Sequence, residues 1–167
     1  MPYKRLRDHG KIIEYVSEFL REWQVKREFA FAHPHHVRAD IFAFHSDLNV
    51  ALVVEAKTSS ENAAISGGIG QLLFYRELLQ TKDFNDVLFS LAIPGSMVDL
   101  KLDLKTGEWV KLEKPSYAVP ITDEAFNFAK RHNIGVFGVA IDGKVFGPVS
   151  KFPLSLWLLV KDLETKE

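Results

Sequence analysis

Two carboxylates and a lysine stand near the ends of two short apolar runs of the chain. Residues 37–44 contain Asp40, and residues 50–57 end with Glu55-Ala56-Lys57. Both runs are rich in β-branched and aromatic residues, and a turn-like segment separates them, so each run predicts a buried strand. A charge inside such a strand is costly unless it is paired or binds a metal ion.

These residue types suit metal-assisted cleavage of a phosphodiester. Mg²⁺ or Mn²⁺ neutralises the negative charge that shields the phosphorus, and it orients the attacking water. Hard cations prefer oxygen ligands, so we expect Asp40, Glu55 and the backbone carbonyl of Ala56 to bind the metal. Alternate residues of a strand point to one face, so Lys57 would lie beside Glu55 and reach the water or the scissile phosphate.

A purely structural interpretation is also open. Glu55 and Lys57 would then form a salt bridge at a strand end, and Asp40 would be a turn residue.

The pattern Asp-x(14)-Glu-x-Lys at Asp40, Glu55 and Lys57 resembles the core of the PD-(D/E)XK nuclease superfamily. Gln71 and Tyr75 resemble the QxxxY element of its RecB-like branch, although Ala39 stands where the superfamily's name has proline. The resemblance covers roughly residues 10–95. It implies a restriction-endonuclease-like αβββαβ core, a Mg²⁺ or Mn²⁺ cofactor, and DNA hydrolysis that leaves a 5′-phosphate and a 3′-hydroxyl.

Gln71 and Tyr75 are four residues apart, so they share one helix face. The resemblance implies that this face borders the active site and contacts the substrate or the catalytic lysine. The alternative is that Tyr75 packs in the core and Gln71 is solvated.

A further acidic ligand is expected from the first helix, because the resemblance implies a glutamate there. Glu14 is the candidate, and Glu18 and Glu28 are its rivals. Each of the three could instead lie on a solvated surface.

Phosphate contacts are expected from residues that flank the strands. Arg38 shares a strand face with Asp40, and Ser59, like Ser60, follows Lys57. Arg38 could instead pair with a carboxylate, and the serines could cap a loop. The histidines of segment 33–36 predict a solvated turn rather than a metal site.

The remaining elements follow from periodicity and turn chemistry. Helices are expected at 6–23, 63–80 and 122–132, and strands at 25–31, 86–93 and 134–141. A hairpin or insertion is expected at 100–112, a tight turn at 142–143 before 144–146, and a short helix from Pro153. Gly67, Gly68 and Gly70 predict either a close approach of another backbone to the second helix or a later helix start. The order indicates an α/β fold whose mixed central sheet is flanked by helices, with an extra hairpin.

The bulk composition indicates one globular domain over residues 1–167. The chain has no cysteine, which excludes a disulfide scaffold, a thiol nucleophile and a zinc ribbon. No window is long enough to span a membrane, so a cytoplasmic protein is expected. The net charge is −1, from 21 basic and 22 acidic residues, which argues mildly against a nucleic-acid partner, although basic residues predominate in 1–38.

The sequence therefore predicts a metal-dependent nuclease that acts on DNA in repair, recombination or defence. RNA is the alternative substrate, and a non-catalytic module that binds nucleic acid or protein is the alternative class. A homodimer formed through the aromatic C-terminal segment is a further hypothesis.

Overall fold

The computed structural model describes residues 3–31, 37–79 and 83–147. For residues 3 and 4 it describes the backbone and not the side chains. The larger of its two sheets has the strand order β2-β3-β4-β5-β8-β9. Strands β4, β5 and β8 are parallel, whereas the pairs β2–β3, β3–β4 and β8–β9 are antiparallel. The strand bounds are β2 Gln24–Ala30, β3 Arg38–His45, β4 Val50–Ala56, β5 Asp86–Pro94, β8 Ile134–Val139 and β9 Val145–Phe146.

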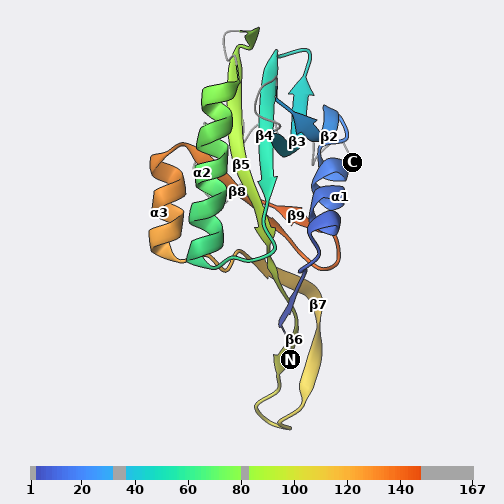
Figure 1. The fold of residues 1–167 in the computed structure, drawn as a ribbon. Helices are drawn as coiled ribbons and strands as arrows, with labels where there is room; N and C mark the ends of the chain where they lie inside the picture. The colour runs from blue at the N-terminus through green and yellow to red at the C-terminus, as the bar shows by residue number, and fades with distance from the viewer. Residues whose placement is uncertain (1–2, 32–36, 80–82, 148–167) are drawn as a thin grey trace.

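Helices cover both faces of this sheet (Figure 1). Helix α1 (His9–Phe19) packs on one face, while α2 (Asn62–Leu78) and α3 (Asp123–Arg131) pack on the other. Side chains of β4 alternate between the two faces: Val54 joins the core under α1, and Val53 joins the core under α2. The predicted mixed α/β fold and the αβββαβ order of its core are thus confirmed.

Helix α1 is shorter at both ends than the predicted helix over 6–23. It begins after Asp8, whose carboxylate accepts the amide of Lys11 as an N-cap. It ends at Phe19, because the chain then turns through hydrogen bonds such as Trp23 N–H to the Leu20 carbonyl. Leu20 and Trp23 are still buried, so their apolar spacing reflects packing of a turn rather than a helix.

Helix α2 includes its three glycines, so the helix does not start later. An added Cβ at Gly68 would lie 2.5 Å from Leu91 Cδ2, whereas nothing lies within 4 Å at Gly67 or Gly70. The close approach at Gly68 is thus made by side chains, Leu91 of β5 and Lys57, and not by another backbone as expected.

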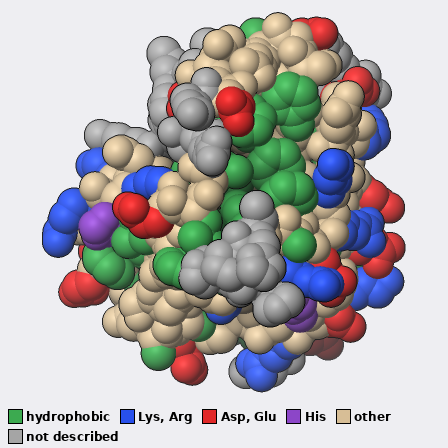
Figure 2. Space-filling view, turned by 45° about the horizontal axis from the view of Figure 1, so that its top comes forward, with side chains coloured by type: hydrophobic (Ala, Val, Ile, Leu, Met, Phe, Trp, Pro, Cys, Tyr) green, Lys and Arg blue, Asp and Glu red, His purple; other side chains and the backbone are tan. Residues whose placement is uncertain are grey.

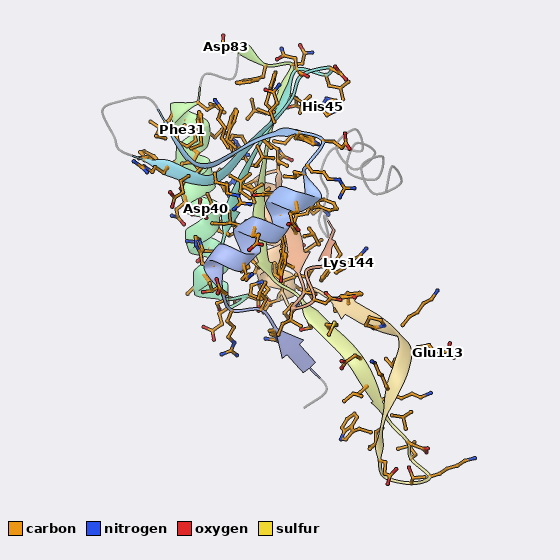
Figure 3. The ribbon with its side chains drawn as sticks, turned by 90° about the vertical axis from the view of Figure 1, so that its right-hand side faces the viewer. Phe31, Asp40, His45, Asp83, Glu113 and Lys144 are labelled. Carbon is orange, nitrogen blue, oxygen red and sulfur yellow. The ribbon has the colours of Figure 1, made fainter. Side chains whose placement is uncertain are left out.

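The extra hairpin forms a separate three-stranded sheet with the order β1-β6-β7 (Figure 1). Its strands are β1 Tyr3–Arg5, β6 Ser96–Leu102 and β7 Trp109–Ala118, which extend beyond the predicted 100–112. Glu113 in Figure 3 marks this arm, which projects away from the body that holds Asp40. The short strand β1 was not predicted, because three residues give no periodic signal.

The C-terminal elements follow the prediction closely. Thr122 caps α3 by accepting the amide of Ala125 at 3.2 Å. The turn after β8 contains Gly143, whose φ of 91° suits glycine. Two expectations, the turn at residues 33–36 and the helix from Pro153, lie outside the described residues.

The sheet end where β3 finishes and β5 begins carries aromatic side chains. Phe44 and Phe42 each pack against Phe84, with ring centroids 5.7 and 6.1 Å apart. Hydrophobic side chains also gather on the face that Figure 2 brings forward, with charged side chains at its flanks. No helix in the described part of the chain is long and apolar enough to cross a membrane.

Candidate active site

The core of the candidate site consists of Asp40 and Glu55, on the adjacent strands β3 and β4. The antiparallel register pairs Ile41 with Val54, and its continuation sets Asp40 opposite Glu55. Glu55 also lies at the carboxyl end of β4, which runs parallel to β5. The apolar composition of both strands thus builds the sheet that holds the two carboxylates together.

Glu55 is a buried acid, with 5% of the residue exposed. The Tyr75 hydroxyl of α2 donates to Glu55 Oε2 at 3.0 Å and also contacts the Arg38 carbonyl at 3.0 Å. The pKa of Glu55 is raised to about 7. Burial is the main cause, and the nearby Asp40 carboxylate is the second. Burial and Glu55 in turn raise the pKa of Tyr75, so the phenol stays protonated and donates.

Asp40 is held by groups from two other elements. Its Oδ2 accepts the amide of Ala56 at 2.8 Å and lies 3.3 Å from His9 Nε2. The Asp40 side chain is 16% exposed and that of His9 is 49% exposed, so the imidazole covers the carboxylate from the solvent side. The sequence analysis missed His9, because a polar first turn gives no signal of what it will contact.

Lys57 continues the face of Glu55 just beyond the end of β4. Its amide donates to the Ala92 carbonyl at 2.9 Å, which keeps the backbone beside β5. Its side chain runs along α2, because Cε lies 3.3 Å from where Gly68 would carry a Cβ. Gly68 therefore leaves room for the lysine stem.

The purely structural interpretation fits this geometry only in part. Asp40 lies within β3 rather than in a turn. The charge of Lys57 does attract Glu55 and lowers its pKa, but Glu55 is hydrogen-bonded to Tyr75, and within the described parts of the chain no close ion pair joins Lys57 to a carboxylate.

Two other predicted residues lie in different surroundings. Gln71 is exposed on α2 and its side chain forms no hydrogen bond with a described residue, in contrast to that of Tyr75 one turn later. Glu14 forms an ion pair with Lys11 at 3.3 Å, with its side chain 41% exposed. Since five helical residues rotate a side chain by about 140°, Glu14 faces away from the direction of His9. In the structure it is therefore His9, and not Glu14, that contacts Asp40 from α1.

The two rivals of Glu14 differ from each other. Glu18 is exposed near the end of α1. Glu28 lies across from Asp40, because the β2–β3 register pairs residues 27 with 41 and 29 with 39. The ladder skips Glu28, whose φ of 51° is left-handed, a costly conformation for a residue with a Cβ.

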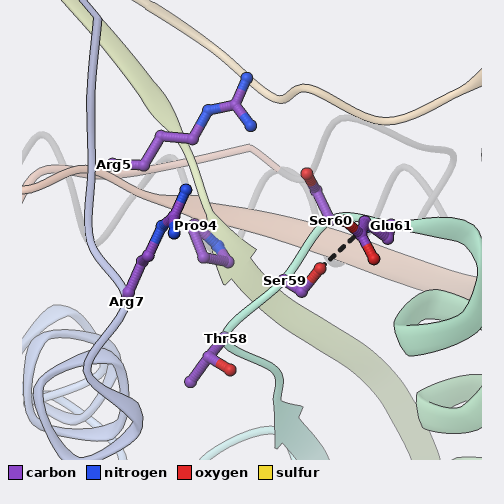
Figure 4. Close-up of a pocket in the computed structure, with 7 residues that line it drawn as sticks. All are labelled: Arg5, Arg7, Thr58, Ser59, Ser60, Glu61 and Pro94. Atoms are coloured by element: carbon purple, nitrogen blue, oxygen red, sulfur yellow. Dashed lines mark hydrogen bonds between the residues drawn. The ribbon is translucent and has the colours of Figure 1, made fainter.

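The expected phosphate contacts lie at separate places. Arg38 is exposed at the start of β3, and only its carbonyl is bonded to Tyr75. Ser59 lies in the β4–α2 loop and lines a cavity together with Arg5 and Arg7 (Figure 4). These two arginines were not singled out from the sequence.

The acidic pair is compared with the donor set that a divalent cation prefers. The described residues contain no group of three His, Cys, Asp or Glu side chains placed to hold a metal ion. Mg²⁺, however, is commonly held by one or two carboxylates, with water and substrate phosphate completing its shell. Two adjacent carboxylates, one with a raised pKa, are the donor set that gains most from a bound cation.

Comparison with known proteins gives two solved structures. One is an XisH family protein from Nostoc punctiforme, with 14% identity, a TM-score of 0.47 and coverage of 83% of this chain and 96% of that one. The other is an FdxN element excision controlling factor protein from Anabaena variabilis, with 14% identity, a TM-score of 0.47 and coverage of 83% and 95%. No protein-family model and no curated protein sequence matches the chain. Similarity at this level carries no inference about activity.

Proposed function

We propose that this protein is a metal-dependent nuclease of the PD-(D/E)XK superfamily that hydrolyses phosphodiester bonds of DNA. The observation that carries the proposal is the pair of adjacent carboxylates, Asp40 and Glu55, with Lys57 on the same strand face. A structural role explains this arrangement poorly, because two neighbouring acids repel each other and one of them is buried.

Each group has a role that its contacts support. Bound Mg²⁺ would neutralise phosphate charge and activate the attacking water. Asp40 and Glu55 would hold the cation, with the Ala56 carbonyl as a further oxygen. Tyr75 orients Glu55, and the Ala56 amide orients Asp40. The charge of Lys57 attracts Glu55, but its ammonium forms no close ion pair with a described residue, so we propose that it also serves the scissile phosphate or the water.

A cleavage assay with conservative variants tests the proposal. The panel contains single strands, duplexes, flaps and junctions of DNA and RNA, with Mg²⁺ or Mn²⁺. Glu55→Gln and Lys57→Met keep the side-chain shape and remove the chemistry, and Glu77→Gln on the exposed surface of α2 is the matched control. We expect cleavage by the wild type and by Glu77→Gln, and a loss of at least a hundredfold in the two site variants.

The same panel tests the alternatives. Cleavage of RNA alone would replace DNA by RNA as the substrate. Absence of cleavage on every substrate, together with no Mg²⁺ binding by calorimetry, would refute the enzyme and favour a binding module, which the net charge of −1 does not disfavour.

Oligomeric state is a separate question. The segment expected to form a homodimer begins at Pro153, outside the described residues. A monomeric mass in solution would refute the homodimer hypothesis and leave the nuclease proposal unchanged.

A further inference from the structure

A polar cavity of about 420 Å³ includes Thr58, the residue that follows Lys57, and is not lined by Asp40 or Glu55. Figure 4 shows two arginines from the N-terminal segment on one side and the hydroxyl-bearing β4–α2 loop on the other. The lining residues are Arg5, Arg7, Thr58, Ser59, Ser60, Glu61 and Pro94.

The two arginines have donors to spare. Arg5 Nε donates to Ser96 Oγ at 3.1 Å, which fixes the guanidinium while its terminal nitrogens form no other hydrogen bond to a described residue. Arg7 is exposed and has neither a hydrogen bond nor an ion pair within the described ranges. Guanidinium groups stay charged and present a planar fork of donors that matches phosphate oxygens.

The opposite wall of the cavity also presents donors. Ser59 Oγ accepts the amide of Glu61 at 3.1 Å, so its own O–H is free to donate. Thr58 and Ser60 form no side-chain hydrogen bond with the described residues. Glu61 is the opposing charge, but two guanidinium groups outweigh one carboxylate, so the cavity favours an anion.

The cavity begins one residue beyond Lys57. Two residues span at most about 7 Å, so Ser59 lies within that reach of Lys57. Successive phosphates of one strand are farther apart than the axial rise of about 3.4 Å per nucleotide, because the backbone winds around the helix axis, so this separation corresponds to about one phosphate step. A strand whose scissile phosphate lies at Lys57 would thus place a neighbouring phosphate at the cavity.

We infer that this cavity is a phosphate subsite for the substrate strand, in which Arg5 and Arg7 bind a phosphate close to the bond that is cut. The inference rests on the proposed function, because that function places the scissile phosphate at Lys57. A backbone phosphate and a terminal phosphate offer the same oxygens, and DNA and RNA offer them equally.

Binding of labelled oligonucleotides, measured by fluorescence anisotropy in EDTA, tests the subsite without catalysis. Arg7→Ala is the main variant, since it removes no contact among described residues, and Arg131→Ala on α3 is the charge-matched control. We expect Arg7→Ala to raise Kd about tenfold. The slope of log K against log salt should fall by about 0.7. Glu61→Gln should lower Kd, because it removes the opposing charge.

The source of the phosphate is found by neutralising one phosphate at a time. Each position of the strand is replaced in turn by an uncharged methylphosphonate, and 5′-phosphorylated strands are compared with 5′-hydroxyl strands. At the contacted position, wild type and Arg7→Ala should bind equally, because the interaction is already absent. An internal position identifies a backbone phosphate, and a dependence on the 5′-phosphate identifies a terminal one.

Failure of the subsite differs from failure of the nuclease. If Arg7→Ala binds like Arg131→Ala, or if the wild type binds no strand, the subsite is refuted. If the wild type cuts DNA and Arg7→Ala cuts with an unchanged KM, the subsite is refuted while the nuclease stands. If binding depends on Arg7 but nothing is cut with any metal, the subsite stands and the nuclease is refuted.

Discussion

Replacement of Glu55 by glutamine should stabilise the metal-free protein at neutral and higher pH. Burial and the Asp40 charge raise the pKa of Glu55 from 4.5 to about 7 in the folded protein. Below about pH 4.5 the carboxyl is protonated in both the folded and the unfolded chain. Between about pH 4.5 and 7 only the unfolded chain loses the proton, so the free energy of unfolding falls as the pH rises.

The magnitude follows from the shift in pKa. About 2.5 pH units at 1.36 kcal/mol per unit correspond to about 3 kcal/mol, fully lost above about pH 7. For a chain of this size that corresponds to about 6–12 °C in Tm. Glutamine carries no charge at any pH, so Glu55→Gln should not show this loss.

Thermal unfolding of both proteins from pH 4.5 to 8.5, in EDTA and in Mg²⁺, provides the measurement. Asp40, Lys57, Tyr75 and His9 are present in both proteins, so the difference between the two curves reports Glu55 together with its interaction with Asp40. We expect the stability of the wild type, relative to the variant, to decline with pH in EDTA and to recover with Mg²⁺ above pH 7. A difference that does not change with pH would refute the claim that Glu55 is a strained buried acid.

Four further substitutions test the surroundings of the site. Gly68→Ala should destabilise the fold by about 1–3 kcal/mol and lower any nuclease turnover, because its Cβ would collide with Leu91 of β5 and press on Lys57. Gly70→Ala, with nothing within 4 Å of the new Cβ, should instead stabilise by about 0.5–1 kcal/mol in chemical denaturation. Tyr75→Phe should lower the free energy of unfolding by about 1–3 kcal/mol. It should also raise the pKa of Glu55 further, because it removes the hydrogen bond that favours the ionised form, and NMR titration of that carboxyl measures the change. Glu28→Gly should raise Tm by relieving a left-handed backbone worth about 1 kcal/mol, and an unchanged or lower Tm would contradict that strain.

The sequence predicted best those parts of the fold where local pattern and tertiary packing agree. The runs that became β3 and β4 are apolar on both faces, as strands covered by helices on both sides must be. The α3 N-cap at Thr122 was found because capping is a local interaction. Asp40 and Glu55 were found because a charge in such a strand stands out.

The sequence did not predict features that depend on distant pairing. Strand β1 exists because residues 3–5 pair with 96–98, a contact without a local signature. His9, Arg5 and Arg7 occur in a polar stretch, where nothing marks one charged residue as facing a site. The positive φ of Glu28 also has no signature in a strand-like segment.

The hydrogen bond from the Ala56 amide fixes how Asp40 can coordinate a cation. Oδ2 is already occupied by this amide and by His9, so Oδ1 is the oxygen left for a metal. Asp40 would therefore be a monodentate ligand, which suits the octahedral shell and retained waters of Mg²⁺ better than the bidentate carboxylates frequent around Ca²⁺. A strand amide that bonds a side chain just past the last β3–β4 pair would thus influence which ion the proposed site takes.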